Sequence, residues 1–333
     1  MGAALRLLLV AAVITGGWYF RGGFGDVAGA LRTAGWLGIV ALAAYHLGPM
    51  ALCGVAWRSL QPKGGLKAFV LSRWVREGVS EIAGFLPLSG ELAGARMLTR
   101  HGIRPAVAAA LTVVDVTSEV LAQFVFSLIG VGLWLWRHPG AEVVRWGMFG
   151  LAASLPVLAA FFFVQRSALM RFIETLPARL LPKIWQAPEI EQGVQAGISA
   201  IYSDHRRVLR AVGLHLGAWL LSAGEAAVAL ALLGHPLPLA DVVAMESIIF
   251  AIRSAAFVIP GAIGVQEGGY VLVGAALGLS PELALAVSLL KRGRELTLGL
   301  AALVVWHLVE TMAKRRDRAR PAAAGLEGEG QTP

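Results

Sequence analysis

Four charged residues occur together in the middle of an apolar segment, residues 281–310: Lys291, Arg292, Arg294 and Glu295. In a helix that rises ~1.5 Å per residue, they lie about 15 to 21 Å along the segment, near the middle of a membrane. On a helical wheel the other three fall within about 100° of Lys291, so one cavity can receive all four. Three cations at that depth predict a binding site for a phosphate or another anionic group.

Further carboxylates accompany this cluster. Asp115 and Glu119 are four residues apart and share one face of an earlier apolar helix, whereas Glu91 and Glu267 lie in apolar stretches that contain glycine and proline. A charged side chain at the membrane centre costs on the order of 3 kcal/mol, so each of these acids should have a function or a partner. We interpret them, together with Glu295, as proton-coupling or gating groups. Ion pairing that only holds helices together stays the alternative.

Two apolar stretches are too broken to be ordinary spanning helices. One is GVSEIAGFLPLSGELAGA, and the other is FVIPGAIGVQEGGY, which also carries Gln266 into the membrane. We assign the reversal of the chain in these hairpins to five residues: Pro87, Gly90, Pro260, Gly261 and Gly264. Broken backbone at membrane depth is tolerated only where protein buries it or a watery cavity receives it. The two hairpins are therefore expected to meet inside the protein and to line a polar interior, with Gln266 and Arg253 among its substrate-binding groups.

The composition indicates a multi-pass membrane protein that lacks recognisable catalytic machinery. Of the 333 residues 57% are hydrophobic and only 15% are charged, and the mean hydropathy is +0.68. Six segments approach the ~20 residues that cross a bilayer: 3–20, 34–57, 105–136, 146–165, 208–234 and 281–310. Cys53 is the only cysteine, and the seven histidines show no spacing typical of metal ligands. We therefore expect an all-α protein with no metal, no cofactor and no enzymatic activity.

The basic residues predict the orientation of these spans. They concentrate at 58–104, at 166–210 and in the tail after residue 313, so these parts are assigned to the cytoplasm together with both termini. Each broken stretch then enters and leaves on one side, as a re-entrant hairpin, and the two enter from opposite sides. The run 66–76, with Arg73 and Arg76, is interpreted as a helix lying among the lipid headgroups. The net charge of +8 indicates attraction to anionic lipids at the cytoplasmic face rather than to nucleic acid.

An internal repeat supports the hairpins. Shifting the chain by 176 residues places Glu91 on Glu267, Gly102 on Gly278, Pro105 on Pro281 and Glu119 on Glu295. The first copy covers about 64–136 and the second about 238–310. Because the charges place the two copies on opposite sides, the repeat is predicted to be inverted, as in many secondary transporters that hold a substrate near the bilayer midplane.

The two broken regions also resemble the signature regions of a known family. SEIAGFLPLSGELAGAR and FVIPGAIGVQEGGY with GLSPELALAVSLLKRGRELTLGL are similar to the flippase-like integral membrane family that includes the transmembrane domain of lysylphosphatidylglycerol synthetase, the multiple peptide resistance factor. The second region in particular is similar to a subgroup associated with hopanoid biosynthesis in bacteria. The resemblance covers about residues 1–312, and residues 313–333 are expected to form a disordered cytoplasmic tail.

This resemblance implies translocation of lipid across the bacterial cytoplasmic (inner) membrane. It also implies that Arg96 lies in or near the headgroup path, together with Glu91, Arg253, Glu267 and the charged residues after Pro281. Only a short polar segment follows the last span, so lysyl transfer is not expected. A membrane enzyme that acts on an isoprenoid or a phospholipid stays an alternative, as does a scaffold for lipid-synthesis enzymes. The lipid itself, which could be a hopanoid, a phospholipid or a polyprenyl-linked lipid, stays open, and so does a homodimeric state.

Overall fold

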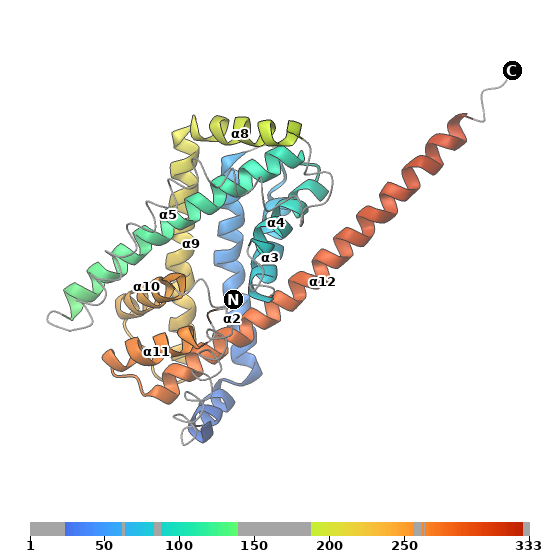
Figure 1. Cartoon of the computed structure of the whole chain (residues 1–333). Helices are drawn as coiled ribbons and strands as arrows, with labels where there is room; N and C mark the ends of the chain where they lie inside the picture. The colour runs from blue at the N-terminus through green and yellow to red at the C-terminus, as the bar shows by residue number, and fades with distance from the viewer. Residues whose placement is uncertain are drawn as a thin grey trace, which may run out of the picture.

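The computed structural model describes residues 24–61, 64–82, 88–138, 188–255, 262 and 264–328. Within these residues the regular secondary structure is helical, apart from short turns between the helices (Figure 1). The described helices are α2 (Phe24–Leu60), α3 (Leu66–Ile82), α4 (Ser89–Arg100), α5 (Pro105–Arg137), α8 (Pro188–Tyr202), α9 (His205–Leu232), α10 (Leu239–Ala255), α11 (Val265–Ala276) and α12 (Pro281–Gly328). The predicted all-α architecture is confirmed for this part of the chain.

Four of these helices contain a segment long and apolar enough to cross a membrane: Gly35–Leu60, Pro105–Arg137, His205–Leu232 and Pro281–Ala313. They correspond to four of the six predicted spans. Those spans were predicted from the length of apolar helix that matches the thickness of the hydrocarbon core. The other two predicted spans, 3–20 and 146–165, lie outside the described residues. The protein is therefore a polytopic helical membrane protein.

In two groups of three helices, the first two helices have matching lengths. Helices α3 and α10 are both 17 residues long, and α4 and α11 are both 12 residues long. The turns before α5 and α12 contain Gly102 and Gly278, which both have a positive φ, of 88° and 80°. Pro105 and Pro281 then begin the long helices α5 and α12. The two repeated segments thus share their local structure, whereas their opposite orientation in the membrane stays a prediction.

The second helix of each group packs closely against the first. In α4, a Cβ on Gly90 would lie 2.4 Å from the carbonyl oxygen of Arg76, so only glycine lets α4 approach α3 this closely. Gly264 has a φ of 81° and caps the N-terminus of α11. Gly90 therefore serves helix packing, whereas Gly264 lies at the start of α11 and its part in reversing the chain stays a prediction. Pro87, Pro260 and Gly261 lie outside the described residues.

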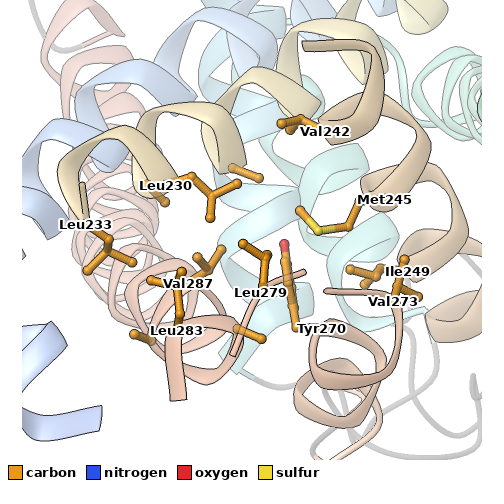
Figure 2. Close-up of a cluster of buried hydrophobic side chains, with 14 of the residues drawn as sticks. Leu230, Leu233, Val242, Met245, Ile249, Tyr270, Val273, Leu279, Leu283 and Val287 are labelled. Carbon is orange, nitrogen blue, oxygen red and sulfur yellow. The ribbon is translucent and has the colours of Figure 1, made fainter. Parts of the chain in front are cut away.

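The two largest of the four buried apolar clusters among the described residues hold the bundle together. The larger one fills the space between α9, α10, α11 and α12, where Leu230, Met245, Tyr270 and Val287 meet (Figure 2). The second lies between α2, α3, α4 and α5, with α8 and α9 against it. Because lipid tails are as apolar as these side chains, such packing stabilises the bundle through close contact rather than through removal from water. Polar contacts between helices then add specificity.

The last helix is longer than its predicted span. In Figure 1, α12 leaves the bundle and continues well beyond it towards the C-terminus. It is helical up to Gly328, whereas the sequence predicts disorder for residues 313–333. Within the bundle, α12 contacts α2, α3 and α11, so its first half can bring charged residues towards the interior.

Candidate functional site

A cavity of about 190 Å³ lies in the interior of the bundle. Its wall is formed by six helices, which contribute His46, Pro49, Met50 and Cys53 from α2, Arg73, Glu77 and Glu81 from α3, Glu119 from α5, Ala218, Trp219 and Ser222 from α9, Phe250 and Arg253 from α10, and Arg294 and Glu295 from α12. Half of these residues are ionisable, which is exceptional in a protein of this hydropathy. The cavity is therefore the leading candidate for a functional site.

The ends of two helices that lead into the predicted hairpins meet at this cavity. Glu77 and Glu81 belong to the last turns of α3, and Phe250 and Arg253 belong to the last turns of α10. The sequence predicts that the two hairpins meet inside the protein and line a polar interior. The last turns of α3 and α10 line one cavity, whereas residues 83–87 and 256–261 lie outside the described residues and the hairpins themselves stay a prediction.

The three arginines of the cavity differ in how tightly they are held. Arg73 forms a two-pronged ion pair with Glu119, with N–O distances of 2.8 and 2.7 Å. Arg294 lies 2.9 Å from Glu225 and 3.2 Å from Glu81. The guanidinium of Arg253, in contrast, is 3.7 Å from Glu295, and its side chain is 25% exposed. Arg253 is thus the cavity arginine with the weakest ion pair among these three.

Aromatic rings support Arg253. The guanidinium lies 5.6 Å from the centre of the Phe250 ring. Phe250 in turn packs edge-on against Trp219, with 4.6 Å between ring centres. A cation above such rings gains a favourable interaction with the ring face and is kept in place without a strong carboxylate partner. This arrangement leaves hydrogen-bonding capacity for an anion.

The four charged residues predicted on α12 separate into two pairs. Arg294 and Glu295 line the cavity, whereas Lys291 and Arg292 are not part of the lining that the described residues form. Lys291 is 2% exposed, and its Nζ lies 2.5 Å from Glu246 of α10. The four therefore do not share one cavity. They occupy a broad face of α12, and different parts of that face contact different helices.

Arg292, Glu267 and Gln266 connect α11 with α12. One oxygen of Glu267 accepts a hydrogen bond from the backbone N–H of Gly264 at 2.7 Å, which caps α11, and the other accepts from Arg292 at 3.1 Å. Gln266 donates to Ser288 at 3.0 Å, and its side-chain oxygen is buried without a partner among the described residues. These contacts give Glu267 a structural role, and they place all three residues beside the cavity wall rather than in it.

The acids of the first repeat face arginines of α3. Asp115 is fully buried and accepts from Arg76 at 2.7 Å and from His215 at 2.9 Å. Glu119 binds both Arg73 and Arg76, and Glu91 is 3.5 Å from Arg76. The predicted acids are thus close together, but their partners were not predicted.

Arg73 and Arg76 correct the interpretation of α3. The sequence suggested a helix lying among headgroups, but both arginines are buried and pair with acids of α5. The polar residues of α3 recur three and four positions apart, which indicated a polar face but not that this face points into the bundle. His46 was missed because an isolated polar residue in an apolar helix gives no periodic signal, whereas Glu77 lies on the polar face of α3, whose direction the spacing does not reveal.

Arg96, which the resemblance placed near the headgroup path, lies elsewhere. It forms a two-pronged ion pair with Glu310 of α12, at 2.6 and 2.8 Å, and Arg100 binds the same carboxylate. None of these three residues belongs to the cavity lining of the described chain. In the structure Arg96 therefore joins α4 to α12.

A thiol, an imidazole and a carboxylate also come together next to the cavity. Ligand atoms of Cys53, His215 and Glu119 lie within 4.8 Å of one another. The Nδ1 atom of His215 is buried without a hydrogen-bond partner among the described residues, while its Nε2 bonds Asp115. Because both oxygens of Glu119 already bind arginines, Glu119 is poorly suited as a metal ligand. The thiol and imidazole could instead serve nucleophilic chemistry.

Comparison with known families identifies the chain. Residues 3–303 match the model of the family described as the lysylphosphatidylglycerol synthase TM region. The comparisons with curated proteins and with solved structures gave no match. The family predicted from the two signature regions is thus confirmed, whereas the hopanoid-associated subgroup stays a prediction.

Proposed function

The chain belongs to the lysylphosphatidylglycerol synthase TM region family, and we propose that it is a transporter that moves a polar or anionic lipid across the bacterial cytoplasmic membrane. The observation that supports this most strongly is a charged cavity inside an apolar helical bundle, between the ends of α3 and α10. Charges at membrane depth are costly and are retained where a polar substrate passes.

The size of the cavity restricts what it can hold. At about 190 Å³ it is smaller than the roughly 300–1,000 Å³ typical of pockets that enclose a drug-sized molecule. A phosphate-bearing headgroup fits such a volume, whereas the acyl or isoprenoid chains do not. The chains therefore stay in the hydrocarbon outside the bundle while the headgroup crosses through the cavity. The cavity formed by the described residues therefore favours binding of the headgroup alone.

Arg253 is the residue we assign to the headgroup phosphate. Its ion pair is longer than those of the two other cavity arginines, and its guanidinium is partly exposed to the cavity. An arginine in this state can offer two parallel N–H groups to a phosphate without first breaking a strong ion pair. Arg294 and Arg73 are already paired with carboxylates, and they add positive electrostatic potential to the cavity.

The mechanism that we propose uses the two matched groups of helices, α3–α5 and α10–α12, as gates. If the two groups have opposite orientations in the membrane, each provides one gate, and the cavity between them opens to one side at a time. In each group a buried ion pair joins the first helix to the third, but with the charges exchanged: Arg76 with Asp115, and Glu246 with Lys291. These pairs keep each group rigid as it moves.

Lipid movement tests the function directly. The protein is reconstituted into vesicles of bacterial polar lipid that contain phosphatidylglycerol with a fluorescent acyl chain, and dithionite is used to quench the outer leaflet. We expect the protein to move the probe between leaflets, and we expect Arg253→Gln to slow this movement at least tenfold. Arg104→Gln, an exposed arginine next to α5, serves as the control and should have no effect. A protein that leaves the probe in its original leaflet is not a transporter of this lipid class.

The opposite orientation of the two groups has its own test. In a chain whose Cys53 is replaced by alanine, single cysteines at Arg100 and Arg104 should react with an impermeant reagent only from the cytoplasmic side. Single cysteines at His235 and Ser280 should react only from the outside. If the cysteines at His235 and Ser280 react from different sides, the inverted arrangement is disproved, because the segment of α10 and α11 between them would then cross the membrane.

A second candidate function rests on Cys53, His215 and Asp115. In this alternative the thiol gives its proton to His215 and attacks a lipid ester, so that a thioester forms while the lipid alcohol leaves with that proton. A hydroxylamine-sensitive acyl adduct on Cys53 would support it. We favour transport because Asp115 is shared with Arg76, which leaves it less able to orient the imidazole.

A further inference from the structure

His46 lies between two carboxylates in the cavity wall. Its Nδ1 is 2.9 Å from an oxygen of Glu225 on α9, and its Nε2 is hydrogen-bonded to an oxygen of Glu77 on α3. The His46 side chain is 9% exposed and that of Glu225 is fully buried. His46 lines the cavity, so a proton that reaches the cavity can reach the imidazole.

The two hydrogen bonds determine how many protons this group holds. Ionised carboxylates only accept hydrogen bonds, and a neutral imidazole has one N–H and therefore can donate to only one of them. For both bonds to exist, His46 must be an imidazolium, or one of the two carboxyl groups must be protonated. In either case His46, Glu77 and Glu225 together hold one proton more than a neutral histidine with two ionised glutamates.

The surrounding charges favour that proton. Arg73 of α3 and Arg294 of α12 lie within 4.0 Å of Glu77 or Glu225, and Arg294 also binds Glu81 of α3. Lys291 of α12 and Tyr45 of α2 face Glu225 as well. Both guanidiniums are shared with carboxylates outside the group, Arg73 with Glu119 and Arg294 with Glu81, so they do not fully compensate Glu77 and Glu225. The added proton supplies positive charge where it is lacking. Of the other cavity carboxylates, Glu119 binds Arg76 as well as Arg73, and Glu295 binds Arg292. An excess charge in such a site is costly, and the proton removes it.

From this geometry we infer that His46, Glu77 and Glu225 form a proton-binding site, and that the protein is a proton-coupled carrier in which one proton accompanies each anionic headgroup. This inference rests on the proposed function. An anion that enters the cavity adds a negative charge a short distance from the site, so it binds more tightly when the proton is present. By reciprocity, the proton binds more tightly when the headgroup is present.

The position of His46 in α2 explains how the proton affects the helices. Pro49 follows three residues later inside the same helix. Because proline has no N–H, the carbonyl of Tyr45 lacks its usual partner, and the helix is easily bent at this point. His46 ties this part of α2 to α3 through Glu77 and to α9 through Glu225. When the proton leaves, only one of these ties can remain, and α2 is released from one neighbour.

A pH gradient across vesicles tests the inference. The probe is the same fluorescent phosphatidylglycerol, the membrane potential is held at zero with potassium and valinomycin, and the measured quantity is the steady-state ratio of probe between the leaflets. One proton per lipid predicts that a gradient of one pH unit shifts this ratio about tenfold, since one pH unit equals a factor of ten in proton activity. His46→Gln should reduce this shift to about onefold, and His101→Gln, outside the cavity, should retain the full shift.

Each outcome decides a different claim. A protein that moves the probe at equal pH but shows no shift in the gradient disproves the proton site and leaves the transport function intact. A full shift in His46→Gln also disproves it, because the proton then binds elsewhere. If His46→Gln does not fold, Glu77→Gln is tested instead. This variant keeps the hydrogen bond between His46 and Glu225 without an added proton. The shift of the probe ratio in the pH gradient must therefore be lost in this variant too. A protein that never moves the probe disproves the function and, with it, this inference.

Discussion

Replacing Lys291 by methionine tests whether the central charges of α12 are structural or functional. The Nζ of Lys291 and the Oε2 of Glu246 are 2.5 Å apart, and both side chains are almost completely buried. At that distance and an effective dielectric constant of ~20, the Coulomb attraction is about 7 kcal/mol, and the loss of hydration of the two charges cancels most of it. Lys291→Met removes the attraction but leaves Glu246 buried, with Tyr270 as its remaining donor.

The free energy of unfolding should therefore fall by roughly 3–5 kcal/mol in Lys291→Met, as for other buried ion pairs that lose one partner. Lys291→Met combined with Glu246→Gln removes both charges and should regain most of that loss. Unfolding of the purified protein in mixed detergent micelles, followed by circular dichroism, measures both values, with the exposed Lys67→Met as control. A double variant that is no more stable than Lys291→Met would refute the pairing, and Lys291 would then have to act in another way.

Two further predictions concern the contacts of α10. A Cβ on Gly130 would lie 1.5 Å from the hydroxyl oxygen of Ser247, so Gly130→Ala should destabilise the protein by about 1–3 kcal/mol through overpacking, whereas Gly132→Ala, with nothing within 4 Å, should not destabilise it. The hydrogen bond from Arg137 lowers the pKa of Asp241. This carboxylate therefore stabilises the fold at neutral pH, and the contribution is lost as the pH falls below the usual value of about 3.9. Asp241→Asn should flatten the decline in the unfolding free energy between about pH 5 and pH 3, and an unchanged decline would show that other carboxylates cause it.

The sequence alone predicts those helices whose first and last residues depend on nearby residues in the chain. The spans 105–136 and 208–234 agree with α5 and α9 because an apolar run of membrane length has few other stable structures. The turns at Gly102 and Gly278 were aligned by the repeat and have the same conformation, because a positive φ favours glycine in both. Such features depend on residues that are close together in the chain.

The partners of the charges could not be predicted in the same way. A helical wheel places Lys291 and Arg294 on one broad face of the helix. It does not show which neighbouring helix each part of that face contacts. In the structure Lys291 contacts Glu246 of α10 and Arg294 contacts Glu225 of α9. Which acid lies opposite depends on the rotation and the depth of two helices, and these are determined by packing across the whole bundle.

His46 was the most important omission. It is a single polar residue in an apolar helix, so neither spacing nor composition singles it out. Its role follows only from two acids that are 31 and 179 residues away in the chain. A histidine close to a proline inside a predicted span would have been the available signal, since both are unfavourable there unless the interior contains polar groups.

Labelling by a lipid headgroup tests the central claim most directly. Phosphatidylglycerol that carries a photoreactive diazirine in its headgroup is mixed into vesicles with the protein and irradiated, and the modified peptides are identified by mass spectrometry. If the headgroup passes through the cavity, the label will be found on its wall, around Met50 of α2 and Trp219 of α9. Excess unlabelled lipid should compete for these positions. Label found only at the exposed ends of the helices, such as near Leu209, with the cavity peptides unmodified, would contradict the account.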